Sequence, residues 1–279
     1  MRGMSQHDAS GANAALLDLA RDIAVRASEF ALDARRAGVS VAATKSTPTD
    51  VVTAADRDTE ALIRSLILDA RPDDGIVGEE DATHVGTSGL DWVVDPIDGT
   101  VNFLYGIPAW AVSIAVVEGA AGSDVSGTTL AGVVVNPVSG ETFEATAGGG
   151  ARLAGRELAV NAGVALPSAL VATGFSYSAE RRREQAAVLH ELLPQVRDIR
   201  RVGAASLDLC SLAAGRIDAY YERGLNAWDH AAGALIAREA GAHVAGPKGG
   251  RESTELLVAA APGLYEELTA ALRAAGLDA

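Results

Sequence analysis

The segment that most constrains the fold of this chain covers residues 92–103, Trp-Val-Val-Asp-Pro-Ile-Asp-Gly-Thr-Val-Asn-Phe. It starts with a short apolar run, which is the pattern of a buried strand. The chain then breaks after Asp95 at a proline and turns through Asp98 and Gly99. An Asp-Gly turn that closes a hairpin would account for this corner. The other interpretation is that the two carboxylates, followed by glycine and the Thr100 hydroxyl, hold a divalent cation beside a phosphate.

The size and charge of the chain narrow its class. With 279 residues, 48% of them hydrophobic, it can build a sizeable core as one large domain or two modest ones. A formal net charge of -14 argues against non-specific binding to nucleic acid or to an anionic membrane surface. The same charge fits a protein in which some carboxylates are metal ligands.

Three features predict the compartment. A single cysteine, Cys210, excludes an internal disulfide and favours a reducing cytosol. Residues 1–13 are polar and lack the apolar core of a signal peptide. No apolar run reaches the roughly 18 residues of a transmembrane helix. We therefore expect a soluble, cytoplasmic protein, with Cys210 packed inside an Ala- and Leu-rich helix.

Hydrophobic periodicity predicts the order of the helices and strands. In the first part, helices cover 14–37 and 56–70, and strands cover 75–78, 110–118, 130–136 and 141–146. Further along, strands at 169–173, 199–202, 217–221 and 256–260 alternate with helices at 179–193, 203–214, 228–240 and from Pro262 onward. This change of pattern suggests sub-domains over 1–155 and 156–279 with a cleft between them.

Carboxylates recur where short apolar segments end, at Asp56, Glu79, Asp95, Asp98 and Asp229. If they converge, they repel, since two unit charges 4 Å apart cost about 4 kcal/mol at an effective dielectric of 20. A cation would neutralise such a cluster, and oxygen ligands select a hard ion, of which Mg²⁺ is the usual one beside phosphate. The five histidines are scattered and show no zinc spacing.

Four stretches, in order along the chain, resemble motifs of the inositol monophosphatase family. They are the mobile loop and its following aspartate (45–50 and 53–56), the acidic strand end Gly78-Glu79-Glu80, the first signature (92–103), and the second signature Trp228-Asp229-His230-Ala231-Ala232-Gly233. The resemblance extends over residues 15–275 and is strongest to the bacterial, SuhB-like branch, through 173–177 and 203–210. It implies a layered αβαβα sandwich of the α/β class, with an α+β first half and an α/β second half.

The resemblance also implies metal ligands. Glu79, Asp95 and the backbone carbonyl of Ile97 would bind one Mg²⁺. A second ion would be bound by Asp95, Asp98 and Asp229, so that Asp95 is shared. A third, weaker ion would depend on Glu79 and water.

Roles around the substrate follow from the same resemblance. Asp56, Glu79 and Thr100 would be the catalytic residues, with Asp56 and Thr100 orienting the attacking water. The Gly99 and Thr100 backbone amides would hold phosphate oxygens. The residues implied to contact the substrate are Asp98, Gly99, Thr100, Gly203, Ala205, Glu222 and Asp229.

The implied activity is Mg²⁺-dependent hydrolysis of a small polyol or sugar phosphate, with myo-inositol 1-phosphate favoured, lithium inhibition and a homodimer. Histidinol phosphate is the next candidate, followed by fructose 1,6-bisphosphate and 3′-phosphoadenosine 5′-phosphate. A different class of answer is a non-catalytic partner of transcription or RNA-processing machinery. The acidic balance disfavours direct RNA binding but is compatible with a protein partner.

Overall fold

The computed structural model describes residues 6–38, 41–44, 51–119 and 127–277. The loop over 45–50, which the family resemblance includes, lies outside these residues. Across the described part of the chain, no helix combines the length and the apolar character that a membrane span requires.

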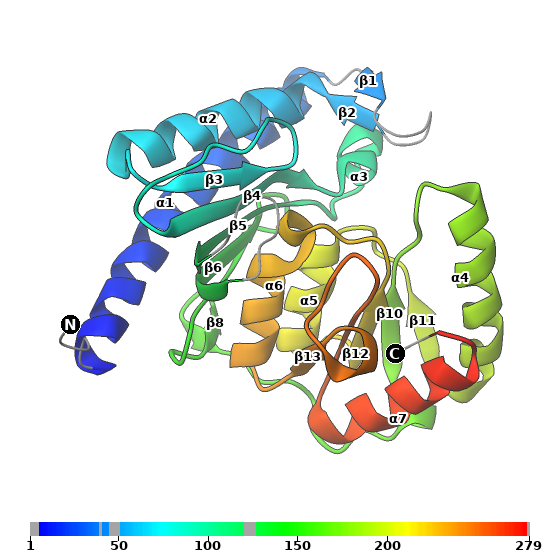
Figure 1. Ribbon diagram of the computed structural model, residues 1–279. Coiled ribbons are helices and arrows are strands. Elements are labelled where there is room, and N and C mark those ends of the chain that lie inside the picture. Colours follow the sequence, from blue (N-terminus) through cyan, green and yellow to red (C-terminus); the bar gives the residue numbers. More distant parts are fainter. Residues whose placement is uncertain (1–5, 39–40, 45–50, 120–126, 278–279) are drawn as a thin grey trace.

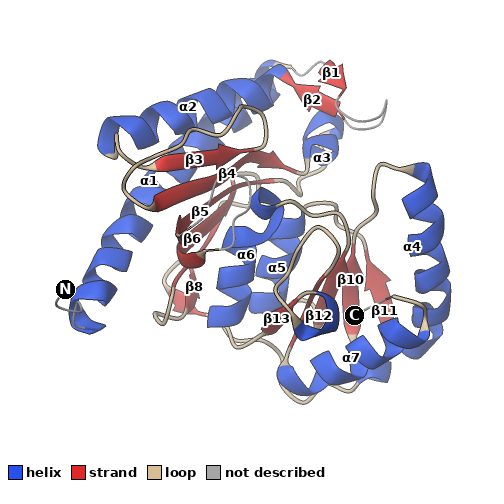
Figure 2. Cartoon of the chain, viewed as in Figure 1, coloured by secondary structure: helices blue, strands red, loops and turns tan. Residues whose placement is uncertain are grey.

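The described elements form five layers in the order helix, sheet, helix, sheet, helix (Figures 1 and 2). The outer helices of the first half are α1 (Gln6–Ala37) and α2 (Ala54–Ala70). They cover a sheet made of β3 (Gly75–Gly78), β4 (Leu90–Asp98), β5 (Ala111–Glu118), β6 (Thr128–Asn136), β7 (Glu141–Thr146), β8 (Ala151–Leu153) and β9 (Arg156–Glu157). The large sheet therefore belongs to the first half of the chain, apart from β9, which lies just beyond residue 155.

The second half supplies the other three layers. Helices α5 (Ala205–Ala213) and α6 (Ala227–Glu239) lie between the two sheets. The second sheet has the order β11 (Asp198–Arg200), β10 (Leu170–Thr173), β12 (Ala219–Glu222), β14 (Leu257–Ala260) and β13 (His243–Ala245). Helices α4 (Ala179–Leu192) and α7 (Pro262–Ala274) cover its outer face. The expected αβαβα sandwich is confirmed.

Buried apolar clusters fill each gap between layers. One joins α1 and α2 to the outer face of the large sheet, and a second joins the inner face of that sheet to α5 and α6. Two more join α5 and α6 to the second sheet and that sheet to α4 and α7. Because α5 and α6 pack against both sheets, the halves share a core, and the division at 155 stays a prediction.

Strand β4 carries the segment from which the sequence analysis began. It lies between β3, which is parallel to it, and β5, which is antiparallel. The expected break at Asp95 is wrong, because β4 continues to Asp98. Its register against β5 shifts between Asp95 and Asp98, as in a bulge, so the proline is accommodated without ending the strand.

A short helix, α3 (Thr100–Tyr105), follows β4 directly. Its Phe103 packs edge-on against Trp110, with ring centroids 4.9 Å apart, and both side chains are buried. This contact fixes α3 at the end of the large sheet. Cys210 is buried in α5, as predicted.

Other element boundaries differ modestly from the sequence predictions. Helix α1 begins at Gln6, well before residue 14, since its polar first turns lack the periodicity by which a helix is found. The short strands β8, β9 and β13, and the separate hairpin of β1 (Val41–Thr44) and β2 (Val51–Thr53), were not predicted. Strands this short carry too little alternation to be found by periodicity, and only some of them, such as β3 and β14, were predicted, from their apolar runs.

Candidate active site

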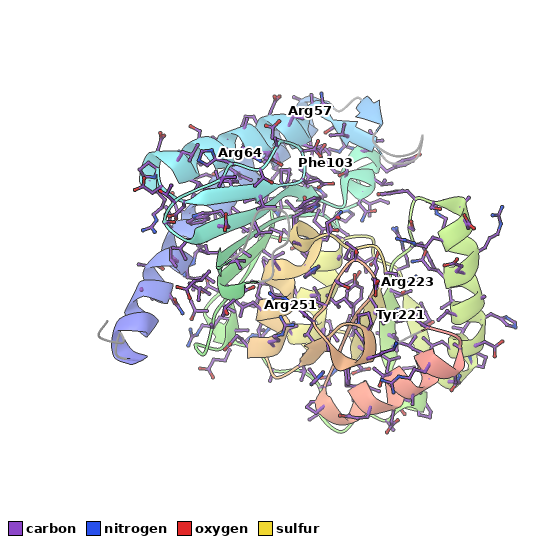
Figure 3. All side chains as sticks on the ribbon, viewed as in Figure 1. Arg57, Arg64, Phe103, Tyr221, Arg223 and Arg251 are labelled. Atoms are coloured by element: carbon purple, nitrogen blue, oxygen red, sulfur yellow. The ribbon has the colours of Figure 1, made fainter. Side chains whose placement is uncertain are left out.

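A cavity of about 560 Å³ opens where the end of β4 faces the second half of the chain. One wall consists of Glu79 and the residues from Asp95 to Thr100. The opposite wall comes from the loop that follows β10, the residues before α5, the end of β12 and the start of α6. In Figure 3 the label of Phe103 marks the α3 side of this junction and that of Arg223 the opposite side. The cavity therefore lies between the halves, as predicted.

Negative charge is concentrated on the first wall, called the acidic wall below, and on Asp229, which lies at the start of α6 in the opposite wall. Burial raises the pKa of the Asp95 carboxyl well above its ordinary value, and the charges of Glu79, Asp98 and Asp229 raise it further. Burial likewise raises the pKa of Asp229, reinforced by Glu79 and Asp98. The mutual effects mean that the four carboxylates lie close enough to repel one another. This arrangement favours a positive partner.

Asp98 connects this wall to the helix behind it. It accepts hydrogen bonds from the backbone amides of Ala205 (3.3 Å) and Ser206 (2.8 Å) and from the Ser206 hydroxyl. These bonds lower the pKa of Asp98, but burial outweighs them and raises it to about 6. A carboxylate at the N-terminus of α5 also interacts favourably with the helix dipole. Asp98 thereby fixes Ala205 against the acidic wall.

Asp229 lies in the first turn of α6 and accepts the backbone N–H of Asn226 at 2.6 Å. This is the reciprocal capping arrangement in which a carboxylate reaches back to the residue before the helix. Capping and a role in the cavity are therefore compatible for Asp229, since its side chain also lines the cavity.

Asp56 and Thr100 form a connected pair behind the cavity surface. The Asp56 carboxylate is fully buried and accepts hydrogen bonds from the backbone and the hydroxyl of Thr53. Its other oxygen lies 3.1 Å from the Thr100 hydroxyl, for which the Ile97 carbonyl at 3.2 Å is an alternative acceptor. When the hydroxyl donates to Asp56, its oxygen is left to accept a proton from the cavity side.

The turn at Gly99 brings the chain from β4 into α3. Gly99 has φ of +94°, a left-handed conformation that favours glycine. A Cβ atom there would lie 3.1 Å from the Ala109 carbonyl oxygen and 3.2 Å from that of Gly203. A side chain would therefore be both strained and crowded, which explains the glycine of this motif.

The opposite wall also carries a half-buried acid, Glu222. Burial raises the pKa of Glu222 to about 7, although the Tyr220 hydroxyl, which donates at 2.6 Å, and the charge of Arg201 lower it. A Cβ atom on Gly174 would lie 2.0 Å from both Glu222 oxygens. The glycine therefore leaves room for this carboxylate.

All predicted site residues except Asp56 line the cavity. Those that line the cavity are Glu79, Asp95, Ile97, Asp98, Gly99, Thr100, Gly203, Ala205, Glu222 and Asp229. Asp56 lies behind them and reaches the cavity through Thr100.

Several lining residues were not predicted as site residues. They are Gly174 to Ser178 after β10, Arg201, Ala204, and the residues Arg223 to Asn226 and Trp228. Asn102 was also missed: its amide donates to the carbonyls of Ala109 (2.7 Å) and Val202 (3.0 Å) and joins α3 to the opposite wall. Its place within the 92–103 motif was the only signal that could have found it.

The donor chemistry of the acidic wall fits a hard cation. Carboxylates and the Ile97 carbonyl, all oxygen donors, border one cavity, and burial and mutual repulsion raise the pKa values of Asp95 and Asp229. Among the described residues, no three His, Cys, Asp or Glu side chains are gathered closely enough to form a finished metal cage. The fit to Mg²⁺ thus rests on donor type and charge.

Comparison with known proteins agrees with the motifs. The model of the inositol monophosphatase family matches residues 12–277. The chain is 48% identical over 259 residues to inositol-1-monophosphatase SuhB of Mycobacterium tuberculosis, covering 89% of this chain and 87% of the relative. It is 41% identical over 223 residues to a Nus factor SuhB of Pasteurella multocida, covering 78% and 81%.

Solved structures give the same result. The extragenic suppressor protein suhB from Bartonella henselae superimposes with a TM-score of 0.85 at 34% identity, covering 93% of this chain and 98% of that one. Sequence and fold therefore point to the same group of proteins.

Proposed function

This chain belongs to the inositol monophosphatase family, and we propose that it is a Mg²⁺-dependent phosphatase that hydrolyses myo-inositol 1-phosphate to inositol and phosphate. The observation that carries the proposal is the convergence of Glu79, Asp95, Asp98 and Asp229 on a cavity that also contains the Gly99–Thr100 turn. Acidic ligands beside a turn that lines the same cavity suit a cation and a phosphate together.

In this proposal Glu79, Asp95, Asp98, Asp229 and the Ile97 carbonyl hold Mg²⁺, with two to three ions per site. When bound, the ions neutralise charge on the phosphate and make water a better nucleophile. The carboxylates hold the ions, and the Gly99 and Thr100 amides hold the phosphate oxygens. The buried position of Asp95, 1% exposed, keeps bulk water from competing for it.

Asp56 and Thr100 orient the attacking water, with Glu79 as the third catalytic residue. The Thr100 hydroxyl donates to Asp56 and accepts a hydrogen bond from water, so a proton leaving the water can pass to Thr100 Oγ1 as its own proton passes to Asp56 Oδ1. Asp56 is held rigidly by its bonds to Thr53, which keeps the acceptor oxygen aimed at Thr100.

The opposite wall binds the alcohol part of the substrate. Gly203, Ala205, Glu222 and Asp229 supply backbone and carboxylate groups for hydroxyls, with Asp98 positioned by its bonds to α5. A cavity of about 560 Å³ is large enough for a small polyol phosphate. Histidinol phosphate and fructose 1,6-bisphosphate are the competing substrates.

A substrate panel tests this proposal. Phosphate release at fixed Mg²⁺ is compared for myo-inositol 1-phosphate, histidinol phosphate and fructose 1,6-bisphosphate. The expected result is the highest kcat/KM for inositol 1-phosphate. A higher value for either competitor would reassign the substrate, and no release from any of them would reject a phosphatase acting on these substrates.

A second candidate role comes from the relatives named Nus factor SuhB. The same fold could bind a protein of the transcription machinery without catalysis, and the net charge of -14 favours a protein partner over RNA. A pull-down that recovers transcription proteins equally with wild type and Asp95→Asn would support this role. If the pull-down recovers no transcription proteins and the protein hydrolyses its substrate well, the result would favour a purely enzymatic role.

A further inference from the structure

A fully buried glutamate, Glu60, lies in the middle of α2 and reaches the end of β3. Its Oε2 accepts the backbone N–H of Glu80 at 2.8 Å, and its Oε1 accepts that of Asp81 at 3.0 Å. Both bonds hold the bend that begins at Glu79. A buried carboxylate is costly unless it is paired and hydrogen-bonded, so this arrangement stabilises one particular course of the chain.

Arg64 completes the attachment. One turn along α2, its Nε donates to Glu60 Oε1 at 2.8 Å, and its guanidinium also donates to the carbonyl of Asp81 at 3.1 Å. Figure 3 shows Arg64 on α2 above the β3 region. Together Glu60 and Arg64 bind two N–H groups and one carbonyl of the bend. The bend is therefore restrained through both its donor and its acceptor groups.

The strand itself is adapted to this contact. An ideal Cβ on Gly78 would lie 2.3 Å from Glu60 Oε1 and 2.5 Å from its carboxyl carbon. Any side chain at this position would displace the carboxylate. Gly78 thus permits the close approach of Glu60 immediately before the cavity residue Glu79.

We infer that Glu60 is a positioning residue that sets the affinity of the site for Mg²⁺ by fixing the backbone on the C-terminal side of Glu79. Glu60 does not line the cavity, whereas Glu79 does. A side chain one residue from a clamped bend has less freedom to leave its position, so the entropy lost when it binds a cation is smaller. The inference rests on the proposed function, because it requires Mg²⁺ to bind at Glu79.

The test is calorimetric titration of the full-length protein with Mg²⁺, without substrate. Glu60→Gln keeps the size of the side chain but can accept with only one oxygen, and we expect its Mg²⁺ dissociation constant to rise by about 10- to 100-fold. The matched control is Glu239→Gln. Glu239 likewise accepts two backbone N–H groups, from Gly148 (2.8 Å) and Gly150 (2.9 Å), but it does not line the cavity. Its Mg²⁺ affinity should stay within about threefold of wild type.

Gly78→Ala disturbs the same contact without removing a charge, which keeps the test decisive if Glu60→Gln folds poorly. Gly78→Ala should also raise the Mg²⁺ dissociation constant. Because both substitutions act on one contact, the dissociation constant of the double variant should exceed that of the more affected single variant by no more than about threefold. Saturating Mg²⁺ should restore kcat in folded Glu60→Gln, which a general structural defect would not permit.

Two outcomes would overturn the inference in different ways. If wild type binds Mg²⁺ and folded Glu60→Gln and Gly78→Ala bind it equally well, Glu60 has no positioning role and the proposed function is unaffected. If wild type itself binds no Mg²⁺, the proposed function and the inference both fail.

Discussion

The two walls of the cavity are built in different ways. The acidic wall comes mostly from one continuous stretch, the end of β4 and the turn into α3, with Glu79 directly after the neighbouring strand β3. The opposite wall is assembled from separate segments around residues 174–178, 201–205 and 222–229. Chemistry that depends on a few contiguous residues can be read from a motif, whereas a surface assembled from distant segments can change piece by piece.

The walls also differ in how they hold their carboxylates. Burial is the largest cause of the raised pKa of Asp95, and three neighbouring acids raise this pKa further. Burial also raises the pKa of Glu222, but there the hydroxyl of Tyr220 and the charge of Arg201 lower it. The acids of the first wall therefore reinforce one another, while the charge of Glu222 is offset in part by its own neighbours. We therefore expect changes in the first wall to affect kcat and changes in the second to affect KM.

The largest effect is expected from Asp95→Asn in the acidic wall. Loss of a shared cation ligand should lower kcat by at least about 10³-fold, since it removes charge stabilisation of the transition state. The melting temperature in EDTA should not fall, because the substitution relieves repulsion with Glu79, Asp98 and Asp229. Phosphate release and thermal melting measure the two quantities. Wild-type turnover in this variant would contradict the assignment.

Thr100→Val tests the proton path of the same wall. The hydroxyl that bonds to Asp56 is lost at nearly constant volume, and kcat should fall by about 10²-fold with little change in KM. Thr100→Ser restores a hydroxyl and should recover most of the activity. A loss of equal size in Thr100→Ser would mean that the methyl group, and not the hydroxyl, is required.

A substitution in the opposite wall should change KM and leave kcat nearly unchanged. Gly174→Ala would place a Cβ atom 2.0 Å from the Glu222 oxygens and force the carboxylate to move. We expect KM to rise about tenfold, equivalent to about 1.4 kcal/mol, with kcat nearly unchanged. Steady-state kinetics on myo-inositol 1-phosphate gives both constants. A fall in kcat alone would contradict the claim that the opposite wall acts on KM and the acidic wall on kcat.

The smallest effect concerns stability and pH. The pKa of Glu222 is about 7 in the folded protein, above its ordinary value of 4.5, so protonation of Glu222 favours the folded state. This stabilisation is complete below about pH 4.5 and is lost as the pH rises through 7. In EDTA, wild type should therefore lose more stability than Glu222→Gln between pH 5 and 8, by a few degrees at about 2–4 °C per kcal/mol. Parallel melting curves for the two proteins would contradict this account of Glu222.

The sequence predicted most helices and long strands from local pattern, such as the amphipathic helix α2 and the apolar run of β5. The layered order of these elements and the roles of the acidic wall came from the resemblance to the inositol monophosphatase family, which rests on contiguous motifs such as 92–103. The continuation of β4 through Pro96 was not predictable, since only its pairing with β5 shows that a bulge absorbs the proline.

Residues that act through distant contacts were the hardest to predict. Glu60 has the sequence appearance of a solvent-facing helix residue, and its burial depends on the bend after β3, twenty positions away in the chain. Arg201 is one of many arginines in the sequence and is recognised only because the segment before α5 folds against the cavity. No local pattern encodes contacts of this kind, because they are created by the packing of the layers.

The most direct test of the central claim is phosphate release from myo-inositol 1-phosphate by the wild-type protein as Mg²⁺ is titrated from zero in the presence of a chelator. We predict no turnover above background without the ion, saturable activation as it is added, and loss of activity when excess EDTA follows. Turnover that is unchanged by removal of Mg²⁺ would contradict the claim that the acidic wall works by holding this cation.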